Sequence, residues 1–342
     1  MPAHPASPAR LAATALLTLL AACSDAGGGS ALAPDDAEAP AAPAAPAVEL
    51  SALAQSSNTW ATRTGLPQAR DGATSASVNG LIYVIGGWTN VSAVRTVERF
   101  NPAGGNQPWS TVASLPSPRS FVAGSGVING KIYIVGGRDS AGVDRKTLYV
   151  YNPSTNTWST KAPLPIAGAQ GTAGVIGGKL YVAVPTANGK RLFRYDPTTN
   201  AWTERAASTH QRVLASGGVI NGKLYVAGGV QSEATGATAG LDVYDPATNT
   251  WQAKANMPTA RFHAAARVLN GKLYVVGGTG YPLTGDLSAV EAYDPGTNTW
   301  TKRASMPTPR SELVADVANG ALYAIGGHSG TSLTSVNESY VP

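Results

Sequence analysis

The chain has 342 residues, with 25 Lys and Arg, 20 Asp and Glu, and a single cysteine, so its formal net charge is +5. One cysteine excludes an internal disulfide framework, and the length suits one large domain or two smaller ones. The basic residues are spread evenly and form no Lys/Arg run, which argues against nucleic acid as a partner.

The first 22 residues have the pattern of a signal peptide. Arg10 precedes an uncharged apolar run over residues 11–20, which is too short to span a bilayer as a mature helix. The next residues, Leu20-Ala21-Ala22-Cys23, resemble a bacterial lipobox, in which the cysteine is lipidated and becomes the mature N-terminus. The resemblance implies an exported protein that is lipid-anchored to the bacterial envelope through Cys23. Ser24 in place of Asp favours the outer membrane or cell surface.

Residues 23–56 form a different segment, rich in Ala and Pro, with too little apolar bulk to fold. We expect a disordered tether behind the lipid anchor. The leader holds one of the 25 bases and the tether five of the 20 acids. The remainder, from residue 57, has 24 bases against 15 acids, a charge near +9 that favours anionic partners.

From residue 57 onward the chain repeats itself about every 50 residues. Five copies of a short apolar strand end in Gly-Gly, at residues 86–87, 136–137, 228–229, 277–278 and 326–327. A sixth copy ends in Val184-Pro185. Short strands at such a period indicate a propeller, because one unit cannot bury both of its faces alone.

Residues 263–302 show the repeating unit most plainly. Asn270-Gly271 separates two apolar runs and predicts a hairpin with a type I′ turn. A third run ends at Tyr293 before Asp-Pro, and a fourth carries Trp300. Each unit is therefore predicted to be a four-stranded meander, with strands a, b, c and d, and the large rings are expected in the core.

These marks, the Gly-Gly pair and a Tyr followed seven residues later by a Trp at a period near 50, resemble the Kelch repeat. The resemblance covers residues 57–342. It implies an all-β, six-bladed β-propeller of four-stranded antiparallel blades, similar to galactose-oxidase-type central domains. It implies nothing definite about activity, because the fold carries unrelated functions.

The last repeat stops at Tyr340-Val341-Pro342 and lacks strand d. The missing strand lies at the other end of the domain, since Ser57-Asn58-Thr59-Trp60 matches the strand d of other repeats. We predict that this N-terminal strand completes the last blade and closes the ring, which leaves no unpaired inner edge.

The two faces of the ring differ in their sequences. One, here called the turn face, carries the a–b and c–d turns, whose Asn-Gly and Asp-Pro residues turn chemistry accounts for. The other, the loop face, carries the variable b–c loops and the d–a links, where binding residues are expected.

An Arg opens strand a in five blades and predicts an anion site at the loop-face mouth of the channel. These residues are Arg70, Arg119, Arg212, Arg261 and Arg310. In the alternative interpretation each Arg bonds backbone carbonyls of its own d–a link and serves blade packing. The third blade departs from the repeat at three places, with Gly168 at the Arg position, Gly177 in its a–b turn and Val184-Pro185 in place of Gly-Gly. These changes could open one side of the channel mouth to a ligand, or they could be ordinary sequence divergence between repeats.

Four further candidates for ligand contact lie on b–c loops and are not dictated by the repeat: Trp88, Arg138, Tyr281 and His328. Trp88 with Arg138 or Arg145 would suit a sugar or a peptide. In the alternative, structural interpretation, Trp88 only covers part of its own blade.

The sequence offers little for catalysis. The three His after the leader have no metal-ligand spacing, and no nucleophile elbow, phosphate loop or calcium loop is present. Glu98, Glu291 and Glu338 each precede a strand c aromatic by two residues, which favours a repeating structural role that bonds backbone or Arg. No catalytic residue, metal or cofactor is expected.

The first hypothesis for function is a non-catalytic binding module, monomeric and lipid-anchored. Its loop face would hold a protein or an anionic glycan at the cell envelope. The competing hypothesis is an exported carbohydrate-active enzyme, by resemblance to bacterial Kelch proteins that epimerise sialic acids. A third possibility is a structural envelope scaffold without a small ligand.

Overall fold

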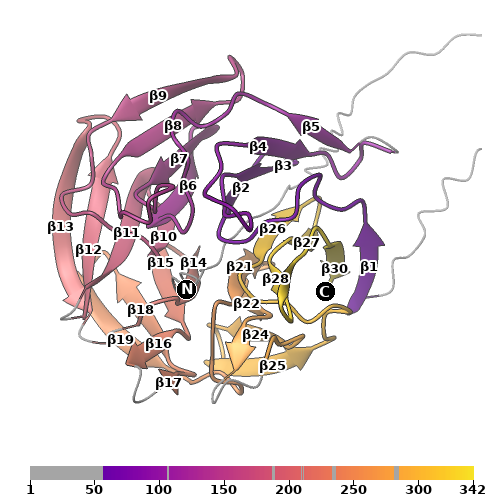
Figure 1. Ribbon diagram of the computed structural model, residues 1–342. Helices are drawn as coiled ribbons and strands as arrows, with labels where there is room; N and C mark the ends of the chain where they lie inside the picture. Colours follow the sequence, from indigo (N-terminus) through magenta and orange to yellow (C-terminus); the bar gives the residue numbers. More distant parts are fainter. Residues whose placement is uncertain are drawn as a thin grey trace, which may run out of the picture. The chain divides into compact units, whose positions relative to one another are not determined.

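The computed structural model describes residues 57–105, 108–186, 189–208, 210, 212–232, 236–280 and 285–342. The predicted leader and tether, with Cys23, and the candidate Tyr281 lie outside the described residues. Ser57–Pro342 form one compact unit. Its elements are all β-strands, and they build six four-stranded antiparallel sheets arranged around a central channel (Figure 1). The predicted six-bladed propeller is confirmed.

In the first three blades, the innermost strand comes first in the chain and each next strand lies further out. Blade 1 has β2 (Thr74–Val78), β3 (Leu81–Ile85), β4 (Val97–Phe100) and β5 (Trp109–Thr111). Blade 2 has β6 (Gly124–Ile128), β7 (Lys131–Val135), β8 (Leu148–Asn152) and β9 (Thr157–Lys161). Blade 3 has β10 (Thr172–Ile176), β11 (Lys179–Thr186), β12 (Gly189–Asp196) and β13 (Ala201–Ser208).

The last three blades follow the same plan, with short additional strands on the loop face. Blade 4 has β14 (Ser216–Ile220), β15 (Lys223–Ala227), β18 (Leu241–Asp245) and β19 (Thr250–Lys254), with β16 (Val230–Ser232) and β17 (Gly236–Ala237). Blade 5 has β21 (Ala265–Leu269), β22 (Lys272–Val276), β24 (Val290–Asp294) and β25 (Thr299–Arg303), with β20 (Arg261–Phe262) and β23 (Thr279–Gly280). Blade 6 has β26 (Val314–Ala318), β27 (Ala321–Ile325), β30 (Asn337–Val341) and β1 (Thr59–Arg63), with β28 (His328–Ser329) and β29 (Ser332–Leu333).

The first strand of the domain closes the ring, as predicted. β1 is antiparallel to β30, with Trp60 opposite Tyr340, and becomes the outer strand of blade 6. In Figure 1 the indigo β1 therefore lies beside the yellow strands of the C-terminus. The ring is closed by a sheet in which residues from both ends of the domain exchange backbone hydrogen bonds.

The a–b turns have the conformation that Asn-Gly predicts. Asn270 and Gly271 have φ of 50° and 72°, both positive as a type I′ turn requires. The third blade keeps this turn, because Gly177 and Gly178 have φ of 55° and 71°. The replacement of Asn by Gly there does not change the turn.

The Gly-Gly pairs let neighbouring blades approach each other closely. A Cβ on Gly86 would come within 2.3 Å of the carbonyl oxygen of Arg119, and the Gly87 N–H donates to that same oxygen at 2.8 Å. In blade 3, Val184 and Pro185 occupy this place, and β11 and β12 pair through it to Thr186 and Gly189. The strands of blade 3 are thus longer where the other blades turn toward their neighbours.

The core lies between adjacent blades, where the strand c tyrosines are buried and the strand d tryptophans are half-buried. Blade 4 shows the contact: the Tyr244 hydroxyl donates to Asn249, and Trp251 Nε1 donates to the carbonyl oxygen of Ala206 in blade 3, at 2.8 Å. The side-chain oxygen of Asn249 also accepts the N–H of Ala206. Burial of the rings together with these directed bonds fixes the position of each blade against the one before it.

Candidate functional site

The five arginines expected to open strand a lie in the d–a links instead, four or five residues before the strand, and four of them are ion-paired inside their own blades. Arg261 is fully buried; its Nη1 donates to the carbonyl oxygens of Gly277 at 3.0 Å and Ala289 at 2.8 Å, and its Nη2 pairs with Glu291. Burial lowers the pKa of Arg261, and Glu291 opposes that shift. The guanidinium is thus held inside blade 5 by three partners.

The same pairing recurs across the ring: Arg70 with Glu98 at 2.5 Å, Arg212 with Asp242 at 2.8 Å and Arg310 with Glu338 at 2.6 Å. Blade 3 lacks both partners, because Gly168 replaces the Arg and Phe193 the acid. The structural role predicted for the three glutamates is confirmed. The structure does not bring these four guanidinium groups together at one mouth of the channel. Ligand binding by them stays a prediction, and it would require an ion pair to open.

Arg119 of blade 2 is the exception, because Tyr149 stands where the other blades have an acid. Its guanidinium carbon lies 5.4 Å from the centre of the Tyr149 ring, a cation–π contact. Nη1 donates to the carbonyl oxygen of Pro118 at 2.6 Å, and Nη2 to the Thr147 hydroxyl at 3.4 Å. Nε is buried without a hydrogen-bond partner among the described residues, and burial lowers the pKa of Arg119.

A surface pocket of about 530 Å³ lies over Arg119 and is bordered by Asp139, Arg145 and Tyr149. Arg145 donates from Nε to Asp139 Oδ2 at 2.7 Å, and this bond holds the pKa of Asp139 below its usual value. The b–c loop of blade 2 also carries Arg138, which donates to Asp144 Oδ1 at 3.0 Å. The pocket thus contains two cations and one carboxylate, with a net positive charge.

The remaining described candidates lie on the loop face as expected, but in separate blades. Trp88 is half-buried and exchanges backbone hydrogen bonds with Asp71, at 2.7 and 3.1 Å. His328 exchanges backbone bonds with Ser311 in blade 6, at 2.8 and 3.0 Å. Such pairing anchors each b–c loop to the d–a link of its own blade.

A ring of residues, one from each blade, surrounds the channel at the loop face, and backbone hydrogen bonds join those of blades 1 to 3 and those of blades 4 to 6. Each blade places one residue there with a left-handed conformation: Gly72, Phe121, Gln170, Leu214, His263 and Glu312. Glu312 N–H, for example, donates to the carbonyl oxygen of His263 at 2.9 Å. Five of the six are not glycine, so their positive φ values store strain that the links between blades hold in place.

His263 and Glu312 of this ring also form a side-chain dyad, with His263 Nδ1 at 3.1 Å from Glu312 Oε1. Burial, with a smaller effect from His328, lowers the pKa of His263 to about 3. The imidazole is therefore neutral at neutral pH. Its weak basicity makes it a poor general base, since the best catalytic pKa lies near the working pH.

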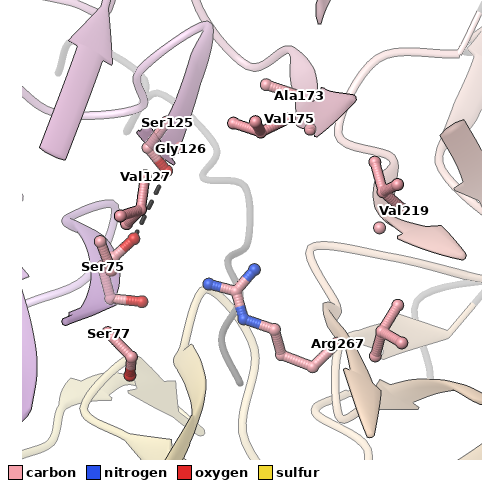
Figure 2. Close-up of a pocket in the computed structure, with 13 residues that line it drawn as sticks. Ser75, Ser77, Ser125, Gly126, Val127, Ala173, Val175, Val219 and Arg267 are labelled. Atoms are coloured by element: carbon pink, nitrogen blue, oxygen red, sulfur yellow. Dashed lines mark hydrogen bonds between the residues drawn. The ribbon is translucent and has the colours of Figure 1, made fainter. Parts of the chain in front are cut away.

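The sequence analysis missed two charged residues in the channel itself. The third residue of strand a is Ala76, Gly126, Gly174 or Gly218 in the first four blades, but Arg267 in blade 5 and Asp316 in blade 6. Arg267 Nη2 lies 3.3 Å from Asp316 Oδ2. Figure 2 shows the Arg267 guanidinium projecting into a cavity of about 290 Å³. Comparison of the repeats position by position would have found this pair.

Two other searches of the described residues gave negative results. They contain no group of three or more His, Cys, Asp or Glu arranged to hold a metal ion. Nor does any described segment form a helix with the length and apolar character to cross a bilayer.

Two family models match the chain over most of the propeller. One, described as the KLHDC2/KLHL20/DRC7 Kelch-repeats domain, matches residues 166–341, just over half of the chain. The other, the Kelch motif, matches residues 69–116 and 123–165. The two matched regions follow each other through all six blades.

Individual proteins also resemble this chain, some over a short stretch of sequence and one solved structure at low sequence identity. The F-box/kelch-repeat protein At1g22040 of Arabidopsis thaliana is 37% identical over 102 residues, 29% of this chain and 21% of that protein. Kelch-like ECH-associated protein 1B of Danio rerio is 38% identical over 104 residues, 30% of this chain and 17% of that protein. The chain thus matches about a fifth of each relative's length. The structure of YjhT shares the fold, with a TM-score of 0.68 and 19% identity, over 80% of this chain and 95% of YjhT.

The repeat pattern, the six blades and the family match over residues 166–341 agree with one another. The chain belongs to the Kelch-repeat family.

Proposed function

We propose that the chain is a non-catalytic binding module that holds a protein partner on its loop face. The observation that carries this proposal is the position of the solvent-exposed apolar side chains. The large exposed hydrophobic residues among those described are Val91, Val143 and Val213, with exposed fractions of 85%, 48% and 38%. All three lie on b–c loops or a d–a link and none on the described part of the turn face, so the exposed apolar side chains occur on the face where binding residues are expected.

The charges beside Val143 indicate what kind of partner segment fits. The pocket over Arg119 and Arg145 is net positive, and Arg119 has no carboxylate partner among the described residues. An Asp or Glu side chain could bind Arg119, while apolar neighbours in the same segment contact Val143. An acidic peptide segment with apolar residues satisfies both features better than a glycan does.

The place of action is also a proposal. The signal-peptide pattern and the lipobox resemblance support export and a lipid on Cys23, with the tether carrying the propeller at the envelope of a bacterium. Cys23→Ser tests this in a Gram-negative host fed a labelled fatty acid. The wild type should incorporate label and sediment with membranes, whereas the variant should do neither. Incorporation of label into Cys23→Ser would contradict the anchor.

A displayed peptide library screened against the full chain tests the binding function. Selected peptides should be enriched in Asp and Glu beside apolar residues. Arg119→Ala and Arg145→Ala should each weaken their binding about tenfold or more, as expected for the loss of a charged hydrogen bond.

The matched control is Arg191→Ala. Arg191 resembles Arg145 in being partly exposed, with side-chain exposures of 40% and 47%, and in pairing with an acid, Glu204. It lies in β12 of blade 3, away from the pocket. Equal losses of peptide affinity in Arg191→Ala and Arg145→Ala would show that the overall charge of the protein, and not the pocket, causes the effect. Selection of acidic glycans on a glycan array, with no acidic peptides, would identify a glycan partner instead.

The competing proposal is an exported enzyme acting on an anionic sugar. Its best described candidate is the His263–Glu312 dyad on the loop-face ring. Turnover in a screen of sialic acids, lost in His263→Gln with the fold intact, would favour the enzyme over the binding module. An absence of binding and of turnover together would favour a structural scaffold.

A further inference from the structure

The central channel contains a chamber that the loop-face proposal does not use. The chamber has a volume of about 290 Å³, room for roughly ten water molecules at about 30 Å³ each. Ser75, Ser77, Ser125 and Arg267 contribute polar groups to its wall. The side chains of Val175 and Val219 form an apolar part across from the serines, and Val127 lies beside the serines (Figure 2). The volume lies at the small end of the range for sites that enclose small molecules.

The strand register places this chamber on the side of the turn face. Its lining residues are the second, third and fourth of strand a in blades 1 to 3, as in Ser75–Ser77 of β2, and the third and fourth in blades 4 and 5. The first residues of these strands, nearer the loop face, surround a much narrower space of about 30 Å³. Thr74 and Thr172 contribute hydroxyl groups to that narrow part. A small molecule would therefore reach the chamber more easily from the turn face.

Arg267 is the unusual group in this wall. It is only 7% exposed, and the one hydrogen bond it makes to another described residue runs from Nη2 to Asp316 at 3.3 Å. Its Nε is buried without a partner among the described residues. A buried guanidinium normally has most of its five N–H groups bonded, because each unmet donor costs free energy. Burial accordingly lowers the pKa of Arg267 well below its usual value.

Asp316, in contrast, is held by several donors. The Ser75 hydroxyl donates to Oδ2 at 2.6 Å, the Ser77 hydroxyl donates to Oδ1, and the N–H of Val317 donates to Oδ1 at 3.1 Å. Its lone pairs are thus directed at blades 1 and 6. Arg267 shares this carboxylate with three other donors and keeps donor capacity toward the chamber.

We propose that the chamber binds a short-chain aliphatic carboxylate. The carboxylate accepts hydrogen bonds from Arg267 at the donors that Asp316 leaves unused, and the Ser125 hydroxyl, which donates to the carbonyl oxygen of Ser75 at 3.4 Å, can turn to donate to it instead. The alkyl chain lies against Val175 and Val219 across the channel. The charge and free donors of Arg267 select the carboxylate group, and the apolar part of the wall selects the alkyl chain of the same small molecule.

Calorimetry and thermal melting with acetate, butyrate, hexanoate and neutral 1-hexanol test this in a buffer free of carboxylates. Hexanoate should bind and raise the melting temperature, with affinity increasing about fourfold for each methylene added from acetate onward. The neutral alcohol should bind at least tenfold more weakly than hexanoate, because it lacks the charge that Arg267 recognises.

Two variants locate the site. Arg267→Met should lower the affinity for hexanoate by about tenfold to a hundredfold, but it leaves Asp316 without its cation and could unfold the chain. Val175→Phe fills the chamber and leaves the Arg267–Asp316 pair in place, so it should abolish binding in a folded protein. Arg119→Ala on the loop face is the control and should leave hexanoate binding unchanged, which also separates this inference from the proposed function.

Three results would overturn the proposal. The first is an absence of hexanoate binding to the wild type, which would mean that the chamber holds water only. The second is hexanoate binding that persists in Val175→Phe. The third is equal affinity for hexanoate and 1-hexanol, which would show that the chamber binds apolar chains without recognising the carboxylate.

Discussion

Arg119 of blade 2 and Arg261 of blade 5 occupy the same place in the repeat but meet different partners. Both are buried, with exposed fractions of 4% and 0%, but Arg261 pairs with Glu291, whereas Arg119 lies over the ring of Tyr149 at the edge of a pocket. One position on strand c decides the difference. A carboxylate there makes the arginine an internal cross-link, and a tyrosine leaves its charge for another partner.

The comparison teaches that repetition of a functional-looking residue is itself evidence of a structural role. Four blades carry Arg and acid together, and blade 3 carries neither. The blade that keeps the Arg and loses the acid has a net positive pocket over that Arg.

Removal of the carboxylate in blade 5 should have the largest effect. Glu291→Gln leaves Arg261 buried with an unpaired charge, so the free energy of unfolding should fall by about 3–5 kcal/mol. Urea denaturation of the variant and wild type measures this loss. The control is Tyr149→Phe in blade 2, which should cost less than about 1 kcal/mol. Similar losses in both variants would refute the distinction between the blades.

The Arg212–Asp242 pair of blade 4 has a pH-dependent neighbour, because the buried Lys190 of blade 3 lies near both residues. Burial, followed by the charge of Arg212, lowers the pKa of Lys190 to about 7 from 10.5, while Asp242 opposes the shift. Between pH 7 and 10.5 the unfolded chain holds a proton that the folded chain has lost, so this group makes stability rise with pH. Below pH 7 both states hold the proton, and its contribution no longer changes.

Lys190→Met should remove this dependence. The difference in free energy of unfolding between wild type and variant should change by up to about 1.4 kcal/mol per pH unit from pH 7 to 9, and stay flat from pH 5 to 6. Urea denaturation at each pH measures it. A difference that is the same at every pH would show that Lys190 titrates normally in the folded chain.

Tyr149→Glu installs in blade 2 the acid that the other blades have. The new carboxylate should pair with Arg119 and compete with a partner's carboxylate, lowering affinity for acidic peptides about tenfold or more. Stability should change by less than about 1 kcal/mol, because a buried pair gains little over its desolvation. Binding titrations and thermal melting check both. Unchanged peptide affinity would remove Arg119 from the proposed site.

The smallest effect is expected for an exposed pair. Arg191 and Glu204 lie on the surface of blade 3, with side-chain exposures of 40% and 46%. Glu204→Gln should change the free energy of unfolding by less than about 1 kcal/mol, and less still in high salt. A loss near that of Glu291→Gln would mean that burial does not set the strength of these pairs.

The fold was predictable because each local signal agreed with the repeat. Asn-Gly at residues 270–271, the Tyr293–Trp300 spacing and the displaced strand at Trp60 all required the same architecture, and the structure has it. The extended strands of blade 3 were not predicted. Val184-Pro185 showed that the rule was broken there, but its consequence depends on pairing with β12.

The site was less predictable, because burial is a tertiary property. Arg261 and Arg119 look alike in the sequence, and only the structure shows which one has a carboxylate within reach. A closer comparison of Tyr149 with Glu291 at the same repeat position would have predicted it. Arg267 and Asp316 break the repeat inside strand a, where the repeat pattern predicts only structural residues, so the pattern did not indicate them.

The closure of the ring by β1 has a consequence for how the protein is made. Tyr340 donates to Asn58, a residue 282 positions earlier in the chain. At a synthesis rate of about 5–20 residues per second, the first strand of the domain waits roughly 14–56 s for its partner. Throughout that time β26 and β2 cannot both have their final neighbours, and Ser75 cannot reach Asp316. The propeller therefore cannot exist as a ring until β30 has been synthesised, and the first strand of the domain is the last to be paired.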